Sequence, residues 1–343
     1  MQNFWATLPK PFFVLAPLAN VTDAAFRRVI AKYSKPGTPY VTYTEFVSAD
    51  GLCKAGQEGR AKLMRDLVFT EAERPIVAQF FTATPEHMEK AAALAQELGF
   101  DGVDINMGCP DKTIEKQGAG AKLILNPERA QELIAAAKRG APNLPVSVKT
   151  RLGYNQDILE EWLPALLEAK PAAIAIHART RKEMSKVPAH WERIKRAVEI
   201  RDELKSETLI IGNGDLKDLA DAEQKIKETG ADGAMLGRAI FGRPWLFVEA
   251  GEAEIPFSGE INTTPTPAKE TSASPERRLR VLTEHTKLFE ELLGDIKSFA
   301  IMKKHFKAYV EGFPGAKELR MKLMEAETAV EVERLVEEYI LKK

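Results

Sequence analysis

Residues 208–238 read TLIIGNGDLKDLADAEQKIKETGADGAMLGR, and this stretch contains one complete strand–helix–strand unit. A short apolar run ends in GNG at 212–214, and a second one ends in GR at 237–238. Between them, Asp218 offers a capping oxygen ahead of a helical stretch, and Gly230 is typical of its stop. Both apolar runs are nearly continuous, as in strands that are buried on both faces of a parallel sheet.

The same alternation extends through most of the chain. Eight strand candidates occur, at residues 12–19, 40–48, 75–83, 102–108, 145–151, 173–180, 208–215 and 233–239. Helical stretches separate them; Pro85 and Pro127 stand at first-turn positions, with Gly99 and Gly140 as stops. Eight such units predict an α/β fold of the (β/α)8 TIM-barrel type. The alternative is a doubly wound open sheet, which the count of eight units disfavours.

The pattern changes after the last strand candidate. Residues 251–274 are rich in Pro, Ser, Thr and Gly, which is typical of a linker or a long surface loop. Residues 275–343 contain four helical segments and no convincing strand. We therefore expect a catalytic barrel over 1–250, a linker over 251–274 and an all-helical C-terminal domain over 275–343.

Composition excludes several classes of protein. The chain has 343 residues, 44% of them hydrophobic and 29% charged, which excludes a disordered chain, a collagen and a heptad rod. Its net charge of −1 indicates neither a nucleic-acid nor a membrane partner. No apolar run approaches the ~18 residues of a membrane span, no signal peptide is evident, and two cysteines form no disulfide framework. We expect a soluble, cytoplasmic protein without a metal site.

Polar and glycine residues gather where the predicted strands end. The carboxyl ends of barrel strands form the active site in this fold. Those ends carry Pro17, Leu18, Ala19, Glu45, Gln79, Asn106, Cys109, Lys149, Arg151, His177, Arg179, Asn213, Gly214, Asp215, Gly237 and Arg238. A purely structural barrel does not need so many amides, charges and glycines on one face, so we expect a functional site there.

The ends of the seventh and eighth strands resemble a phosphate site. Gly214 and Gly237 let backbone N–H groups approach an anion, and Arg238 supplies a fixed cation. The alternative is a pair of turn glycines beside a surface arginine. Because both motifs occur at the two strand ends that usually bind phosphate in this fold, the phosphate site is favoured.

Three further residues carry possible chemistry. Lys149 could neutralise an anionic cofactor ring or form a Schiff base, or it could be a rim ion pair. His177 is either a ligand contact or a structural histidine. Cys109 lies in a non-helical loop before a proline, and with an ordinary pKa of about 8.5 its thiol could act as a general acid. The alternative is a buried, inert cysteine, as we expect for Cys53 in its glycine-rich loop.

Several motifs together resemble one family. They are DINMGCP at 104–110, KTR at 149–151, HARTR at 177–181 and NGD at 213–215, within matching segments that span residues 15–247. A further stretch, KKHFKAY followed by GFPGAKELR, matches the helical region. With these motifs the chain resembles the tRNA-dihydrouridine synthases, flavin-dependent enzymes with a (β/α)8 barrel and a C-terminal helical domain.

The resemblance implies roles for individual residues. Cys109 would be the proton donor. The FMN-binding positions would be Pro17, Leu18, Ala19, Gln79, Lys149, His177, Asn213, Gly214, Asp215, Gly237 and Arg238. Asn106, Arg151 and Arg179 would contact the substrate. The implied reaction adds hydride from reduced FMN to C6 of a tRNA uridine and a proton from Cys109 to C5. NADPH, or NADH, would reduce the flavin, and the enzyme would be a monomer.

One segment departs from the family pattern. Residues 184–191 read MSKVPAHW, where the bacterial enzymes usually carry an aromatic residue and a glycine. This departure leaves open which tRNA position is reduced.

The net charge of the chain conceals a basic segment. The segment from Lys297 to Lys322 contains seven Lys or Arg and two Glu, which is a surplus of five positive charges. Lys303, Lys304 and Lys307 lie within this segment, and Lys303 and Lys307 share one helix face. A solvated helix face is the ordinary interpretation, but the resemblance favours contacts with tRNA phosphates.

Three other functions remain as alternatives. A flavin barrel similar to dihydroorotate dehydrogenase would turn over a free pyrimidine without tRNA. A flavin-free lyase would use Lys149 as a Schiff-base amine. A non-catalytic RNA-binding protein would not need Cys109 or the flavin positions.

Overall fold

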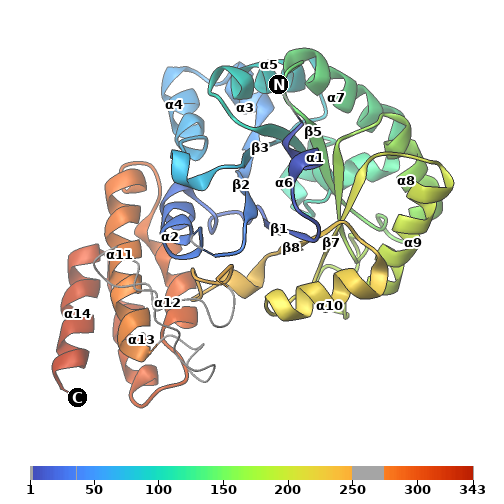
Figure 1. Cartoon of the computed structure of the whole chain (residues 1–343). Coiled ribbons are helices and arrows are strands. Elements are labelled where there is room, and N and C mark those ends of the chain that lie inside the picture. The colour runs from blue at the N-terminus through green and yellow to red at the C-terminus, as the bar shows by residue number, and fades with distance from the viewer. Residues whose placement is uncertain (1–2, 36, 249–273, 343) are drawn as a thin grey trace. The chain divides into compact units, whose positions relative to one another are not determined.

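Eight parallel strands form a closed barrel in which each strand pairs with the next, and the first pairs with the last (Figure 1). The computed structural model describes residues 3–35, 37–248 and 274–342. The strands are β1 (Phe12–Leu15), β2 (Tyr40–Ser48), β3 (Ile76–Phe81), β4 (Gly102–Asn106), β5 (Val146–Arg151), β6 (Ala173–His177), β7 (Leu209–Asn213) and β8 (Gly233–Leu236). The predicted TIM barrel is therefore confirmed over the open sheet.

The helices of this barrel unit connect one strand to the next. They are α3 (Ala49–Lys54), α4 (Gln57–Asp66), α5 (Pro85–Glu97), α6 (Lys112–Lys116), α7 (Pro127–Gly140), α8 (Leu159–Glu168), α9 (Trp191–Glu203) and α10 (Leu219–Thr229), with a 3-10 turn η2 (Gly120–Leu125). The capping signals act as expected. The Asp218 side chain accepts a hydrogen bond from the N–H of Asp221 at 2.9 Å, and Gly230 ends α10 with a φ of 75°. Cys53 lies in α3, so the glycine-rich loop expected for it is wrong.

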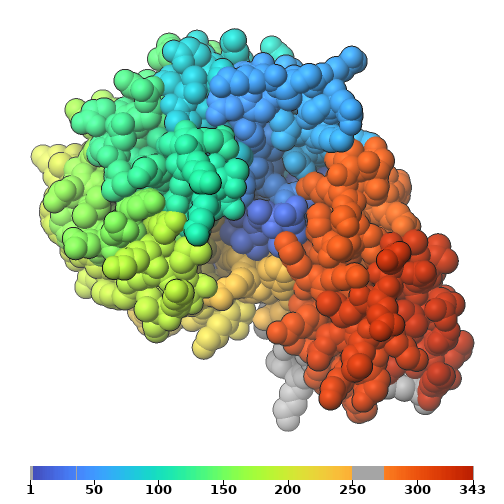
Figure 2. Space-filling view, turned by 180° about the vertical axis from the view of Figure 1, so that it is seen from behind, coloured from blue at the N-terminus to red at the C-terminus, as the bar shows by residue number. Residues whose placement is uncertain are grey.

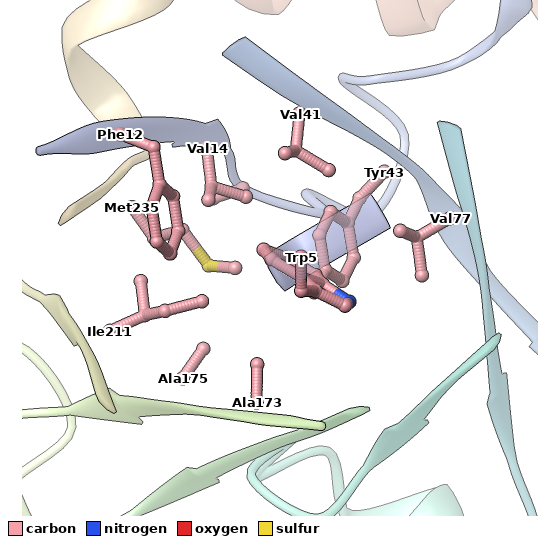
Figure 3. Packing of buried hydrophobic residues seen from close by; sticks show 11 residues of the cluster. Trp5, Phe12, Val14, Val41, Tyr43, Val77, Ala173, Ala175, Ile211 and Met235 are labelled. Atoms are coloured by element: carbon pink, nitrogen blue, oxygen red, sulfur yellow. The ribbon is translucent and has the colours of Figure 1, made fainter. Parts of the chain in front are cut away.

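A tryptophan from outside the sheet helps to fill the barrel core. Trp5 belongs to the short helix α1 (Phe4–Thr7) and is 1% exposed. Figure 3 shows its indole among side chains of six strands, including Phe12 and Val14 of β1, Tyr43 of β2 and Met235 of β8. This apolar packing occupies the barrel interior, so the polar residues that follow the strands are left at the strand ends.

Within the described residues, a second compact unit comprises residues 20–35, 37–39, 69–73, 239–248 and 274–342. Its helices are α2 (Ala24–Ser34), α11 (Pro275–Leu293), α12 (Lys303–Tyr309), α13 (Ala316–Leu323) and α14 (Ala329–Leu341), with 3-10 turns η1 (Glu71–Glu73), η3 (Arg238–Ile240) and η4 (Phe299–Met302). In this unit α11 packs against α2 and α14, and α11 to α14 form the orange and red surface of Figure 2. All residues of the expected linker except Ser274 lie outside the described part of the chain, so the predicted boundaries at 250 and 275 stay predictions.

No helix within the described residues is long and apolar enough to span a membrane.

Candidate active site

The strand register places the predicted polar residues of β4 to β7 in two adjacent rows. Asn106 lies beside Lys149, Arg151 lies beside His177, and His177 lies beside Asn213. These residues all stand at or next to the carboxyl ends of their strands. The barrel therefore collects them at the end where this fold carries its active sites.

Cys109 lies in the loop after β4, and its backbone is held from several sides. The side-chain oxygen of Asn106 accepts the N–H groups of Gly108 at 3.1 Å and Cys109 at 2.9 Å. The Cys109 carbonyl accepts the N–H of Ala121 at 2.9 Å. Arg151 Nε donates to the carbonyl of Gly108 at 2.7 Å. The thiol is thus carried by a loop with a fixed backbone.

Glycine is required on one side of this loop. Gly120 has a φ of 61°, and an added Cβ would stand 2.7 Å from the carbonyl oxygen of Cys109. Any other residue at this position would have to displace the backbone that carries the thiol.

Burial keeps the Cys109 thiol protonated. It raises the pKa of Cys109 above its ordinary value, and the negative charge of Asp111 acts in the same direction. The positive charges of Arg151 and Lys149 oppose this shift without reversing it. A thiol with a raised pKa holds its proton near pH 7, as a general acid must.

Lys149 is a half-buried cation that has a neutral hydrogen-bond partner. Its Nζ donates to Oδ1 of Asn213 at 3.2 Å, while Asn213 Nδ2 donates to the carbonyl of Met235 at 2.7 Å. Burial and the nearby Arg151 lower the pKa of Lys149 to about 8. In the described part of the chain Asn213 is its one hydrogen-bond partner, so two ammonium protons are available to a ligand.

Arg179 joins the ends of β6 and β7. It is 2% exposed, and its Nε donates to the carbonyl of Val187 at 2.6 Å. Its NH1 lies 3.1 Å from Nε2 of His177, and its NH2 pairs with Oδ2 of Asp215. Each guanidinium nitrogen thus has a partner within the protein.

Asp215 connects this buried arginine to an exposed one. Its other carboxylate oxygen accepts from NH2 of Arg238 at 2.7 Å, and the Arg238 side chain is 67% exposed. Burial alone would raise the pKa of Asp215, but hydrogen bonds from Arg179 and the backbone of Ala189 lower it overall. The predicted phosphate-binding cation is therefore oriented by a fixed carboxylate.

His177 is uncharged in this setting. Burial lowers the pKa of His177 to about 2, and the cations Lys149, Arg151, Arg179 and Arg238 act in the same direction. Because Arg179 can only donate, Nε2 of His177 is the acceptor and its proton lies on Nδ1.

The remaining predicted barrel residues surround the ends of β1, β7 and β8. Pro17 is buried, Leu18 is half-buried and Ala19 is exposed. Gly214 has a φ of 132°, in the region that favours glycine. A Cβ added at Gly237 would meet Ala16 and Leu18 at ordinary distances of 3.6 and 3.7 Å.

The three predicted basic contacts lie in the other unit. Lys303, Lys304 and Lys307 belong to α12, where Lys304 and Lys307 are exposed and Lys303 is half-buried.

The segment that departs from the family pattern is a loop after β6. Met184 adopts a positive φ of 57° and is 39% exposed. The loop is held at Val187 by Arg179 and at Ala189, whose N–H donates to Asp215 at 2.9 Å.

The sequence interpretation missed one residue. Asp104 of β4 is fully buried, and its Oδ2 accepts from Nε2 of Gln79 at 2.7 Å. Its Oδ1 accepts from the hydroxyl of Ser147 at 2.6 Å. The signal was a charged residue in the middle of an apolar strand, because a carboxylate is not buried there without partners.

No group of three or more potential metal ligands occurs among residues 3–35, 37–248 and 274–342.

Comparisons with known proteins place this chain among relatives of one family. A family model described as dihydrouridine synthase matches residues 14–343. A "Probable tRNA-dihydrouridine synthase" of Staphylococcus aureus (strain COL) is 40% identical, covering 98% of this chain and 96% of its own. A "Probable tRNA-dihydrouridine synthase 2" of Bacillus subtilis (strain 168) is 41% identical, covering 98% and 97%.

A solved structure supports the fold alone. Histamine dehydrogenase from Rhizobium sp. 4-9 matches 68% of this chain and 44% of its own with a TM-score of 0.51 and 12% identity. The family match covers almost the whole chain, and both relatives align with nearly all of it at 40% identity or more. The chain therefore belongs to the dihydrouridine synthase family of oxidoreductase enzymes.

Proposed function

We propose that this protein reduces the C5=C6 bond of specific uridines in tRNA, with FMN as its cofactor, NADPH as the reductant of that flavin and Cys109 as the proton donor. The observation that carries the proposal is the protonated, loop-held Cys109 thiol beside Lys149, in a chain 40% identical to a probable tRNA-dihydrouridine synthase. The proposal is that the chain shares the activity in that relative's name.

The residues at the strand ends suit an anionic flavin mononucleotide. Arg238 is exposed and oriented by Asp215, and we assign the phosphate to this cation and to backbone N–H groups of the loops that contain Gly214 and Gly237. Lys149 is a half-buried ammonium with protons available, which suits the electron-rich edge of a reduced ring system. When bound there, reduced FMN would supply the hydride.

The protein's own contribution is the proton and its placement. Hydride addition at C6 moves negative charge towards C5 and O4 of the uracil, and a proton must then reach C5. Cys109 would donate that proton from its Sγ, and the raised pKa of Cys109 keeps the proton available until negative charge develops. After donation the thiolate would regain a proton from solvent.

Cations near the thiol support this step. Arg151 and Lys149 favour the charged form of Cys109, so they would stabilise the thiolate that the transfer leaves behind. Asn106 and Arg151, which hold the Cys109 loop, are the side chains we assign to contacts with the uracil. The base must leave its stack to reach them, as base-modifying enzymes require.

The decisive experiment maps dihydrouridine in tRNA from cells that lack the protein. We expect one or more positions to lose the modification, the wild-type gene to restore it, and Cys109→Ala not to restore it. Cys53→Ser is the matched control, because Cys53 is the other of the two cysteines and is not among the residues that we assign to the site, and it should restore the modification fully.

Two other results would redirect the assignment. Turnover of a free pyrimidine without tRNA would favour a small-molecule oxidoreductase. A colourless protein that borohydride traps on its substrate through Lys149 would favour a Schiff-base lyase.

A further inference from the structure

A chain of buried side chains leads from Asp104 to the backbone of Cys109. Asp104 Oδ2 accepts from Nε2 of Gln79 at 2.7 Å, and Oε1 of Gln79 accepts from Nδ2 of Asn106 at 3.0 Å. Oδ1 of Asn106 then accepts the N–H groups of Gly108 and Cys109. Asp104 and Gln79 are fully buried and Asn106 is 5% exposed.

The side-chain amides of Gln79 and Asn106 form a relay between Asp104 and Cys109, and the orientation of both amides is determined at the two ends of this relay. Backbone N–H groups can only donate, so Asn106 must turn its oxygen towards Cys109 and its NH₂ towards Gln79. An ionised carboxylate can only accept, so Gln79 must turn its NH₂ towards Asp104. The two requirements agree while Asp104 is ionised, and both amides then have one orientation.

We propose that Asp104 is a positioning residue whose carboxylate sets the direction of the Gln79–Asn106 relay, and that its protonation loosens the hold of this relay on Cys109. The catalytic meaning rests on the proposed role of Cys109, but the relay itself does not. Asp104 has no role in the site assigned above, where Gln79 is a flavin contact and Asn106 holds the Cys109 loop and contacts the substrate.

Protonation of Asp104 on Oδ2 would leave no orientation of the two amides that satisfies both ends of the relay. The new O–H is a donor, so it needs the side-chain oxygen of Gln79 as its acceptor. If Gln79 turns to provide that oxygen, its NH₂ faces the NH₂ of Asn106, and two donors cannot form a hydrogen bond. Either the hydrogen bond between Gln79 and Asn106 is lost, or Asn106 also turns. In the second case the NH₂ of Asn106 faces the N–H groups of Gly108 and Cys109, which then have no acceptor there. An unmade hydrogen bond in a buried site is costly, so the N–H of Cys109 would lose part of its acceptor.

The surroundings of Asp104 place its pKa in a pH range where proteins are usually studied. Burial raises the pKa of Asp104 to about 6, although hydrogen bonds from Ser147, Gln79 and Tyr43 and the charge of Lys149 oppose the shift. The cations and the tyrosine near Asp104, and the Cys109 thiol, have higher pKa values than Asp104. The pKa of Lys149 is about 8 and that of Arg151 about 10, and the pKa values of Tyr43 and Cys109 are raised.

The test uses the two cysteines of the chain. Full-length protein labelled with 15N at cysteine gives two amide resonances, and Cys53→Ser identifies which one belongs to Cys109. Between pH 5 and pH 7 we expect the Cys109 amide to shift with one midpoint near the pKa of Asp104, below the pH at which Lys149 titrates. The Cys53 amide is the internal control and should not follow this titration.

Two variants at position 104 separate charge from structure. Asn in Asp104→Asn can turn its oxygen to Gln79 and its NH₂ to the hydroxyls of Ser147 and Tyr43, so the relay is kept and the titration removed. We expect its Cys109 amide to stay near the high-pH position of the wild type throughout. Asp104→Leu removes the acceptor and should displace this amide at every pH.

Asp111→Asn is the matched control, because Asp111 is the other carboxylate close to the thiol. It should retain the wild-type midpoint. A Cys109 amide that does not move in the wild type, or that keeps its midpoint in Asp104→Asn, overturns the proposal. A relay that passes this test while Cys109→Ala still forms dihydrouridine would refute the proposed proton donor alone.

Discussion

His285 of α11 and His305 of α12 meet edge to face in the second unit, with ring centroids 4.6 Å apart. Both side chains are fully buried. Neither ring has a hydrogen-bond partner for its nitrogens within the described residues. Phe26 of α2 stacks on His285 at 4.7 Å, so the pair lies in an aromatic cluster.

This pair predicts that acid destabilises the helices of the second unit. Burial lowers the pKa of His285 well below its usual range and that of His305 to about 3. In the unfolded chain these histidines have a pKa of about 6.5, so below that pH they are protonated when unfolded and neutral when folded. The free energy of unfolding therefore falls by about 1.4 kcal/mol per pH unit for each histidine. The loss continues until pH reaches the folded pKa.

Hydrogen exchange of α11, corrected for intrinsic rates, measures this loss between pH 7 and pH 5. His305→Leu should roughly halve the slope, and His190→Gln, at the start of α9, should leave it unchanged. A slope that His305→Leu does not alter would show that other groups take up the protons.

A second prediction concerns the buried ion pair between Arg27 and Glu73. Arg27 Nε lies 2.8 Å from Glu73 Oε2, and both side chains are fully buried. Replacing Glu73 breaks a buried ion pair by removing one of its charges, so Glu73→Gln should cost about 3–5 kcal/mol of unfolding free energy. Urea unfolding measures it. Glu58→Gln is the control, because its partner Lys62 is solvent-exposed on α4 and the pair should add nothing measurable.

A third prediction concerns Arg179, whose three nitrogens all have partners within the protein. Arg179→Met leaves Asp215 with Arg238 and the backbone N–H of Ala189, and it releases the loop at Val187. Because a hydrogen bond to a charged group contributes about 1.5–3 kcal/mol, FMN affinity should fall by about tenfold or more, measured by flavin fluorescence. Arg196→Met, on the surface of α9, should keep the wild-type affinity.

The opposite outcome for Arg179 is equally informative. If Arg179→Met binds FMN normally but loses affinity for tRNA, the substrate contact implied by family resemblance is correct, and the hydrogen bonds to His177 and Asp215 do not position the flavin.

Much of the barrel and of its polar end could be predicted from sequence, because both depend on local patterns. Continuous apolar runs gave the strands, and Asp218 and Gly230 gave the ends of a helix through backbone chemistry that acts within one turn. Contacts over long sequence separations left no such signal. The packing of Trp5 in the barrel core, the relay from Asp104 and the clustering of α2 with α11 appear only in the folded chain.

The last prediction tests the basic surface of α12. Lys304 and Lys307 are exposed, and they belong to a segment with a surplus of positive charge. If they contact tRNA phosphates, Lys304→Gln with Lys307→Gln should weaken binding and reduce the slope of log affinity against log salt by about 1 per lysine. Filter binding at several salt concentrations measures this slope. Lys195→Gln with Lys227→Gln removes the same charge from exposed positions of α9 and α10 and should leave the slope unchanged. Equal slopes for the α12 variant and the wild type would mean that these lysines are only a solvated helix face and that tRNA is held elsewhere.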